Sequence, residues 1–111
     1  MKPRYKPMLA KLAKTPFDSD EWIFEVKWDG IRAISHVDNE LSIRSRNQKE
    51  LRHNFPELAE LKALTQEVVL DGEIIVMNEG KTDFQALLER SRSTTISNIE
   101  CLAQKFPVTY I

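Results

Sequence analysis

The segment 67–77, which reads EVVLDGEIIVM, constrains the fold of this chain more than any other segment. Its two apolar runs, 68–70 and 74–76, indicate a strand covered on both faces, with a kink or bulge at Gly72. An Asp-Gly pair is as typical of a tight hairpin turn. A charged group in a buried strand is costly unless it is paired or binds a ligand. The residues alone therefore leave two interpretations open, a hairpin turn and a functional carboxylate.

A second strand is predicted over 22–29, where apolar and charged side chains alternate. Successive side chains of a strand lie on opposite faces, so the apolar residues would share one face and the charged residues the other. The charged face would consist of Glu25, Lys27 and Asp29. The strand is expected to stop at Gly30, and Arg32 would follow in the next strand on the same wall as the lysine.

Lys27 has two interpretations at this point. In the first, it lies on a solvated face of an antiparallel sheet, in weak ion pairs with the carboxylates on either side. In the second, it is a nucleophile. A lysine attacks only in its neutral form, which nearby cations favour and nearby carboxylates oppose. Glu25 and Asp29 therefore suit a nucleophile only if they contact a nucleotide base or hydrated Mg²⁺.

The rest of the chain has the periodicities of short strands and helices. The runs 31–37 and 40–45 predict a hairpin around Asp38 and Asn39, and 108–111 predicts the start of a strand. Leucines at every third position predict a packing helix within 49–64. Asp83 is a suitable cap for a helix over 84–90, and another helix is predicted over 96–105.

The motif K-x-D-G-x-R, formed by Lys27, Asp29, Gly30 and Arg32, resembles the first motif of the covalent nucleotidyltransferases. These enzymes are the ATP-dependent DNA ligases, the RNA ligases and the mRNA capping enzymes. Later motifs of the ligases follow in order. They are S-R-N at 45–47, D-G-E at 71–73, and F-x-x-L-x-x-R through Phe84, Leu87 and Arg90. Nearly the whole chain thus resembles the first half of the adenylation domain of a bacterial or archaeal ATP-dependent DNA ligase.

This resemblance implies an α+β fold, a largely antiparallel sheet with packed helices, as a partial nucleotidyltransferase domain over 1–111. A basic arm, 1–19, would precede a motif-bearing core, 20–111. The resemblance also implies the activity of a DNA ligase (ATP), EC 6.5.1.1, with ATP and Mg²⁺ as cofactors. The substrate would be nicked double-stranded DNA, in replication, repair or recombination. The missing remainder of such a ligase is an expected partner.

The family's mechanism, carried over, assigns a role to each motif residue. Lys27 would take AMP from ATP, with Asp29 supporting the lysine or the metal. Glu25 would contact the adenine, and Arg32 and Glu73 the sugar and phosphate region. Arg46, with Ser45 beside it, would contact the DNA end, because a guanidinium presents a planar fork to phosphate oxygens. Asp71 is expected to be a turn residue or a group that supports its neighbours.

The composition limits the kinds of binding site and the cellular location that this chain can have. The net charge of −1 over 111 residues argues against nucleic-acid binding by bulk charge, so a DNA contact needs a local patch. The single cysteine, Cys101, excludes an intramolecular disulfide and is expected in the core. His36 and His53 have no zinc spacing with it. No apolar stretch reaches about 20 residues, which predicts a cytoplasmic protein without a membrane partner.

Two other functions remain open at this stage. The chain could belong to a related RNA ligase or capping nucleotidyltransferase, or it could be a non-catalytic half-domain used for nucleotide binding or assembly. Half a domain would also leave a strand edge and an apolar face uncovered, which predicts self-association as a homodimer.

Overall fold

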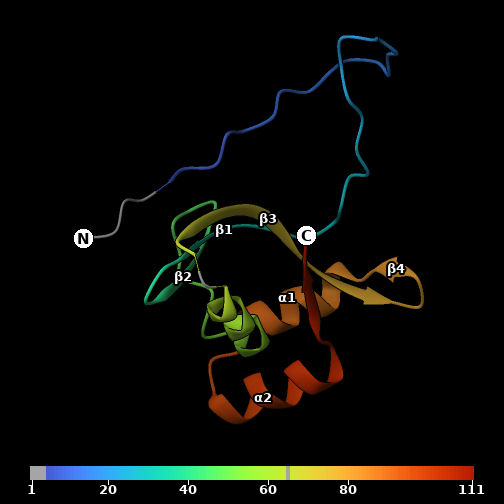
Figure 1. The fold of residues 1–111 in the computed structure, drawn as a ribbon. Helices are drawn as coiled ribbons and strands as arrows, with labels where there is room; N and C mark the ends of the chain where they lie inside the picture. Colours follow the sequence, from blue (N-terminus) through green and yellow to red (C-terminus); the bar gives the residue numbers. More distant parts are fainter. Residues whose placement is uncertain (1–4, 65) are drawn as a thin grey trace.

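The computed structural model describes residues 5–64 and 66–111 of the chain, which form an antiparallel sheet with helices on one of its faces (Figure 1). The sheet has the order β2-β1-β3-β4, and β5 also pairs with β3. The expected α+β class is confirmed. The elements are β1 (Ile31–Val37), β2 (Leu41–Ser45), the 3₁₀ helix η1 (Pro56–Ala63), β3 (Val68–Asn78), β4 (Lys81–Thr82), α1 (Phe84–Arg92), α2 (Ile96–Lys105) and β5 (Val108–Tyr110).

The predicted hairpin is formed by β1 and β2, which pair from Ala33 opposite Ser45 to Val37 opposite Leu41. Its turn is closed locally, because the Oδ1 atom of Asp38 accepts a hydrogen bond of 2.8 Å from the backbone N–H of Glu40. This use of an aspartate side chain is the turn chemistry that the sequence indicated.

β3 runs without a break through the Asp-Gly-Glu segment, so the hairpin-turn interpretation of these residues is wrong. The strand pairs with β1 from Val68 to Ile74 and with β5 from Ile74 to Val76. Gly72 allows the C-terminal residues 110–111 to approach β3 closely, because a Cβ atom at Gly72 would lie 2.5 Å from the carbonyl oxygen of Ile111 and 2.8 Å from the Tyr110 ring. The pairing is tight enough to exclude a side chain at this position.

The core lies between one face of the sheet and the helices. Alternate residues of the strands point into it, including Val37, Ile43 and Ile74, and they meet Phe55 and Leu87 from the helical side. The other face of the sheet, called the open face below, carries the intervening residues of the register. On β1 and β3 these are Arg32, Ile34, His36, Val69, Asp71, Glu73 and Ile75.

A buried ion pair joins the helical elements. Arg90 of α1 is 1% exposed and donates two hydrogen bonds to the carboxylate of Glu57 in η1. It also donates to the carbonyl oxygens of Asn54 and Phe106, each at 3.1 Å, and its guanidinium lies 5.0 Å from the centroid of the Phe55 ring. Arg90, which ends the F-x-x-L-x-x-R motif, therefore holds the helices together.

Two helices agree with prediction and one differs in type. α1 begins after Asp83, whose side chain accepts from the backbone N–H of Ala86, and α2 covers the predicted range. The helix expected within 49–64 is a 3₁₀ helix limited to Pro56–Ala63. The leucine spacing of three is compatible with this type, because side chains at i and i+3 align in a 3₁₀ helix, but it is also found on one face of an α-helix. Cys101, expected in the core, is exposed on α2.

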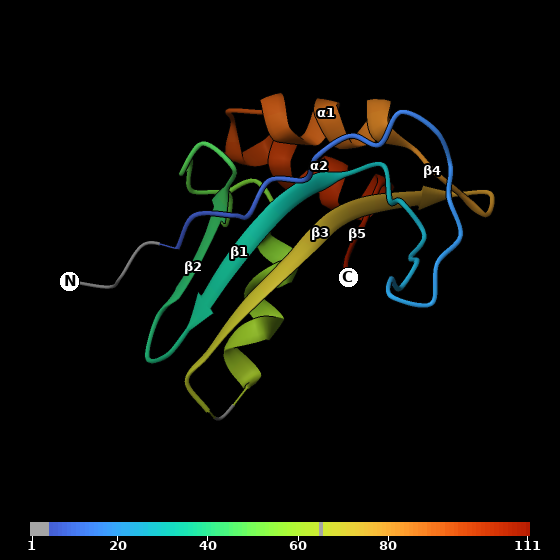
Figure 2. The same ribbon diagram turned by 90° about the horizontal axis from the view of Figure 1, so that it is seen from above.

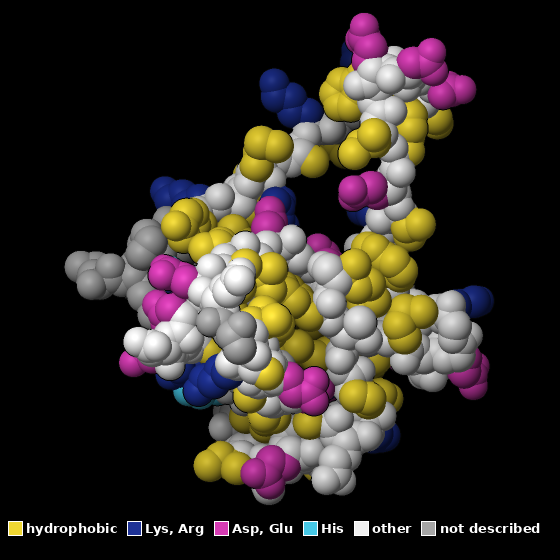
Figure 3. Space-filling model, viewed as in Figure 1, with side chains coloured by type: hydrophobic (Ala, Val, Ile, Leu, Met, Phe, Trp, Pro, Cys, Tyr) yellow, Lys and Arg dark blue, Asp and Glu magenta, His cyan; other side chains and the backbone are white. Residues whose placement is uncertain are grey.

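The predicted strand 22–29 does not form, and the segment is irregular. Its apolar side chains stay exposed, at 60% for Phe24 and 70% for Val26, and Figure 3 shows the yellow surface of this part of the chain. Phe24 and Trp22 make edge contacts with the ring of Phe17, with centroids 5.6 and 5.7 Å apart. A strand needs a partner for its backbone groups, and no strand of the described residues pairs with this one.

The described segment 5–29, a longer range than the basic arm expected over 1–19, is called the arm below. It lies on the open-face side of the sheet, and α1 and α2 lie on the opposite side (Figure 1), as the view from the arm's side in Figure 2 also shows. In the described part of the chain, no helix is long and apolar enough to cross a membrane.

Candidate active site

The open face brings together three of the charged residues singled out in the sequence. Arg32 of β1 stands directly opposite Glu73 of β3, and Asp71 lies on the same face two residues before it. Arg32 pairs with Asp71 rather than with Glu73. Its Nε atom donates to Oδ1 at 3.0 Å, and Nη2 donates to Oδ2 at 2.6 Å. This is the two-bond geometry that suits a guanidinium and a carboxylate.

The electrostatics of the three groups follow from this arrangement. The hydrogen bonds between Arg32 and Asp71 raise the pKa of Arg32 and lower the pKa of Asp71. Glu73 behaves in the opposite way. Burial raises its pKa above the ordinary value, the charges of Asp71 and Asp29 raise it further, and Arg32 only partly opposes them. Glu73 therefore has a carboxylate that gains from a ligand able to donate hydrogen bonds.

Gly30 places the start of β1 tightly against β3. A Cβ atom at Gly30 would lie 2.2 Å from the carbonyl oxygen of Ile74 and 2.7 Å from a side-chain carbon of Ile75. Only a glycine allows this approach. The close contact brings Asp29 near enough to Glu73 for its charge to act there. Two motifs distant in sequence, K-x-D-G-x-R and D-G-E, thus lie side by side.

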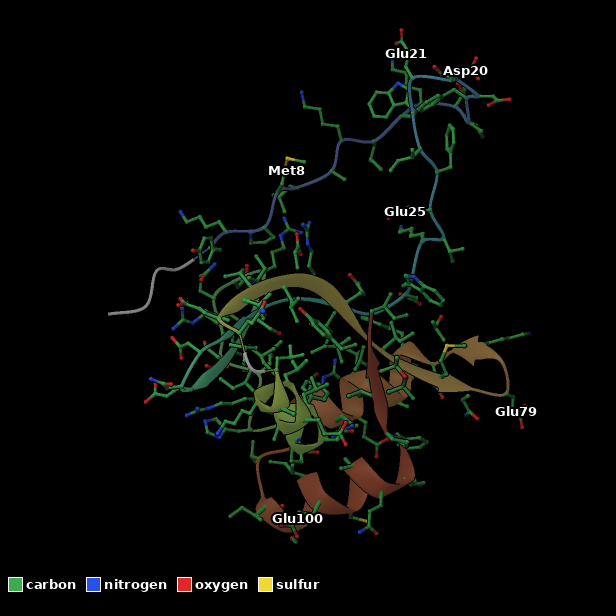
Figure 4. All side chains as sticks on the ribbon, in the orientation of Figure 1. Met8, Asp20, Glu21, Glu25, Glu79 and Glu100 are labelled. Atoms are coloured by element: carbon green, nitrogen blue, oxygen red, sulfur yellow. The ribbon has the colours of Figure 1, made fainter. Side chains whose placement is uncertain are left out.

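Lys27 and Glu25 are not part of this cluster. Both lie in the exposed, irregular part of the arm, and Figure 4 shows Glu25 above the sheet. Among the residues that the structure describes, neither side chain makes a hydrogen bond or an ion pair. The geometry therefore brings Arg32, Glu73 and Asp29 together. Lys27 lies outside this cluster, three residues before Gly30, the glycine that packs against β3.

Among the described residues, the arm contacts the sheet and the turn that follows β2 through Met8 and Tyr5. The carbonyl oxygen of Met8 accepts a hydrogen bond from Nη1 of Arg32, so the guanidinium is engaged on both edges. The ring of Tyr5 meets the ring of His36 edge-on, with centroids 6.2 Å apart. The side chain of Gln48 donates to the carbonyl oxygen of Tyr5 at 3.4 Å.

Ser45 and Arg46, the residues expected to face DNA, lie in the turn that follows β2. The Oγ atom of Ser45 accepts from the backbone N–H of Lys49 at 3.1 Å, so its hydroxyl closes the turn. Arg46 is exposed and lines a shallow hollow together with residues of the arm, among them Lys6 and Pro7. Its guanidinium is accessible to an anion.

Of the two roles expected for Asp71, the turn is wrong, while the ion pair with Arg32 agrees with a group that supports its neighbours. Sequence reasoning did not identify Arg32 as its partner. The signal that could have found it is the register of an antiparallel pair, because residues on the same face of neighbouring strands reach each other diagonally. The sequence alone does not give the register of β1 and β3, because it also allows residues 71–73 to form a hairpin turn.

The sheet, its helices and this charged open face define a nucleotidyltransferase-type α+β domain. Residues 7–111 match the family model described as ATP dependent DNA ligase domain, and the chain belongs to this family.

Individual relatives agree with this assignment. The chain is 43% identical over 89 residues to the SPbeta prophage-derived DNA ligase-like protein LigB of Bacillus subtilis, covering 78% of this chain and 33% of the relative. It is 35% identical to DNA ligase C1 of Mycolicibacterium smegmatis, covering 100% of this chain and 34% of the relative. The chain thus spans about a third of the length of these relatives.

Solved structures show the same fold. A mycobacterial DNA ligase D complexed with ATP and MES superposes with a TM-score of 0.54 at 25% identity, covering 78% of this chain and 26% of that one. The ligase domain of LigD from M. tuberculosis gives a TM-score of 0.51 at 27% identity, with the same coverage.

Proposed function

We propose that this chain is the first part of an ATP-dependent DNA ligase adenylation domain, in which Lys27 receives AMP. The observation that supports this most is the meeting of two motifs on the open face. Arg32 stands opposite Glu73, and Gly30 packs against β3 so that Asp29 lies nearby. The combination suits a sugar and phosphates, because donors and acceptors for both are presented on one wall.

The residues present suit ATP and Mg²⁺ in their charges. The guanidinium of Arg32 interacts with the carboxylates of Asp71 and Glu73, and a third carboxylate, that of Asp29, acts on Glu73. The cluster therefore has more negative than positive charge and could accept a cation. Mg²⁺ would neutralise phosphate charge when bound with the nucleotide. Asp71 would keep the plane of the Arg32 guanidinium fixed, and Glu73 would accept a hydrogen bond from a ribose hydroxyl.

In the proposed reaction, the neutral amine of Lys27 attacks the α-phosphorus of ATP. A nitrogen–phosphorus bond forms, the bond from phosphorus to the pyrophosphate oxygen breaks, and the amine loses a proton. AMP would then pass to the 5′-phosphate of a nick, and the 3′-hydroxyl would displace it. Glu25 would contact the adenine, and Arg46, beside Ser45, would contact the DNA end.

This role requires the arm to move. Lys27 is exposed, and the segment around it carries uncovered apolar side chains. Because the relatives are about three times as long, we propose that a further part of such a ligase covers this segment and brings Lys27 to Arg32 and Glu73. The setting would be the cytoplasm, in DNA replication, repair or recombination.

A second candidate is a non-catalytic half-domain that binds a nucleotide or assembles with a partner. The exposed position of Lys27, away from the charged cluster, favours this candidate. A related RNA ligase or capping activity differs from the first proposal only in its substrates. GMP attached to Lys27 would distinguish a capping enzyme, whereas an RNA ligase would carry AMP and be distinguished by the nucleic acid that it seals.

The test is an intact-mass measurement after incubation with Mg²⁺ and ATP, alone and with the remaining two-thirds of a ligase relative added. The proposal predicts one added AMP, lost in Lys27→Ala and retained in Lys14→Ala, a control lysine in the same arm. GTP in place of ATP tests the capping alternative. An unmodified chain under both conditions would favour the non-catalytic candidate.

A further inference from the structure

A second cluster of charged groups lies at the far end of β1 from Arg32. His36 is the second-last residue of β1 and lies on the open face, Asp38 lies in the turn that follows, and Glu67 immediately precedes β3. One ligand atom from each residue lies within 4.8 Å of the other two. The sequence did not indicate this cluster, because the third residue is far along the chain from the other two.

The distances in the cluster suit a shared metal ion. The Nε2 atom of His36 lies 3.2 Å from Oε1 of Glu67 and 3.9 Å from Oδ2 of Asp38. A tetrahedral ion with bonds of about 2.0–2.2 Å separates its ligand atoms by roughly 3.4 Å. The two separations lie on either side of this value, and the Glu67 side chain, 71% exposed, is able to adjust.

The imidazole is held in place before any ligand arrives. His36 is 7% exposed and stands between its register neighbours Ser42 and Val69, with the edge contact of Tyr5 beside it. Its Nε2 atom faces the carboxylates, at 3.2 Å from Oε1 of Glu67, whereas its buried Nδ1 atom has no hydrogen-bond partner among the described residues. Imidazole nitrogen suits zinc-like ions, whereas Mg²⁺ prefers oxygen ligands.

We propose that His36, Asp38 and Glu67 form a site for a divalent transition-metal ion of the zinc type. The ion would bind Nε2 of the histidine and one oxygen of each carboxylate, and solvent would complete its coordination. It would tie the β1–β2 turn to the start of β3. His36 is four residues along the strand from Arg32, roughly 13 Å away, so the site does not depend on the proposed ligase function.

Metal titration of the untagged chain tests this proposal. The Cys101→Ser background is used, because the exposed Cys101 thiol would itself bind zinc or cobalt. Zn²⁺ is followed by calorimetry and Co²⁺ by its visible absorption, with Mg²⁺ as the comparison ion. We expect one Zn²⁺ per chain, and a melting temperature raised by roughly 10 °C at 100 times the dissociation constant.

The key variant is Glu67→Gln, which keeps the shape of an exposed side chain and should leave the metal-free melting temperature unchanged. It should weaken binding at least about 10-fold. Asp38→Asn should do the same while keeping the Oδ1 acceptor for Glu40. His53→Gln, which changes the exposed histidine outside the cluster, should bind as the parent does.

Three results would overturn the proposal: no saturable binding of Zn²⁺ or Co²⁺, equal binding by Glu67→Gln and the parent, or loss of binding in His53→Gln. Any of them would leave the contact between His36 and Glu67 as a hydrogen bond only.

Discussion

The ion pair between Glu57 and Arg90 is predicted to be the polar contact whose loss destabilises this fold most. Arg90 has a fully buried side chain, and Glu57 is its only carboxylate among the described residues. Glu57 also accepts a hydrogen bond of 3.0 Å from the backbone N–H of Val108, so the pair joins η1, α1 and the start of β5. Changing Glu57→Gln would leave the guanidinium charged, buried and without a counter-ion.

The expected cost of Glu57→Gln is about 3–5 kcal/mol in the free energy of unfolding, the usual penalty when one partner of a buried pair is removed. A domain of this size has roughly 5–15 kcal/mol in total, so this variant should lose about a fifth of its stability or more. The double variant Glu57→Leu with Arg90→Met should recover part of the loss, because it removes both charges and fills the space with apolar groups.

Urea denaturation followed by circular dichroism measures these free energies. The control is Asp71→Asn, which breaks the ion pair with Arg32, whose side chains are 34% and 51% exposed. An exposed pair contributes about 0–1 kcal/mol, so the control should be nearly neutral. The reasoning would be refuted if Glu57→Gln cost no more than Asp71→Asn.

Four further predictions concern pH, packing, DNA and assembly. Burial raises the pKa of Glu57, but hydrogen bonds from Arg90 and Val108 outweigh it and leave the pKa below its ordinary 4.5. The parent should therefore lose stability as pH falls below about 4.5, and Glu57→Gln should lose less over that range in acid-dependent unfolding. Gly30→Ala, which drives a Cβ into the backbone of β3, should cost about 1–3 kcal/mol in the same urea assay. Arg46→Ala should reduce the salt dependence of binding to nicked DNA by about one charge, whereas Arg92→Ala on α1 should not. The exposed apolar arm should drive self-association, which sedimentation at high concentration would contradict by showing only monomers.

Much of the local structure could be predicted because each feature depends on a few neighbouring residues. Asp83 caps α1 by accepting from a backbone N–H three residues later, and Asp38 closes the hairpin turn in a similar way. Such contacts depend on spacing within one turn of chain. The leucine spacing before β3 predicts a helix but does not distinguish an α-helix from the 3₁₀ helix that forms, because side chains at i and i+3 lie on one face in both.

The candidate site could be predicted only in part. The motifs indicated Arg32 and Glu73, and the register of β1 and β3 places them opposite each other. The ion pair of Arg32 with Asp71 depends on that register, so it was decided by the tertiary structure. The predicted position of Lys27, on the same wall as Arg32, is wrong, because the segment around it does not form the expected strand.

The sequence by itself determined the helices α1 and α2, the β1–β2 hairpin, the fold class and the family, since these follow from periodicity, capping residues and ordered motifs. Only the tertiary structure decided that 71–73 continues a strand, that 22–29 has no partner, and that His36 meets Glu67. The physical reason is the same in each case. Backbone pairing and side-chain contacts between distant segments depend on which segments meet, and alternation within one segment does not specify its partner.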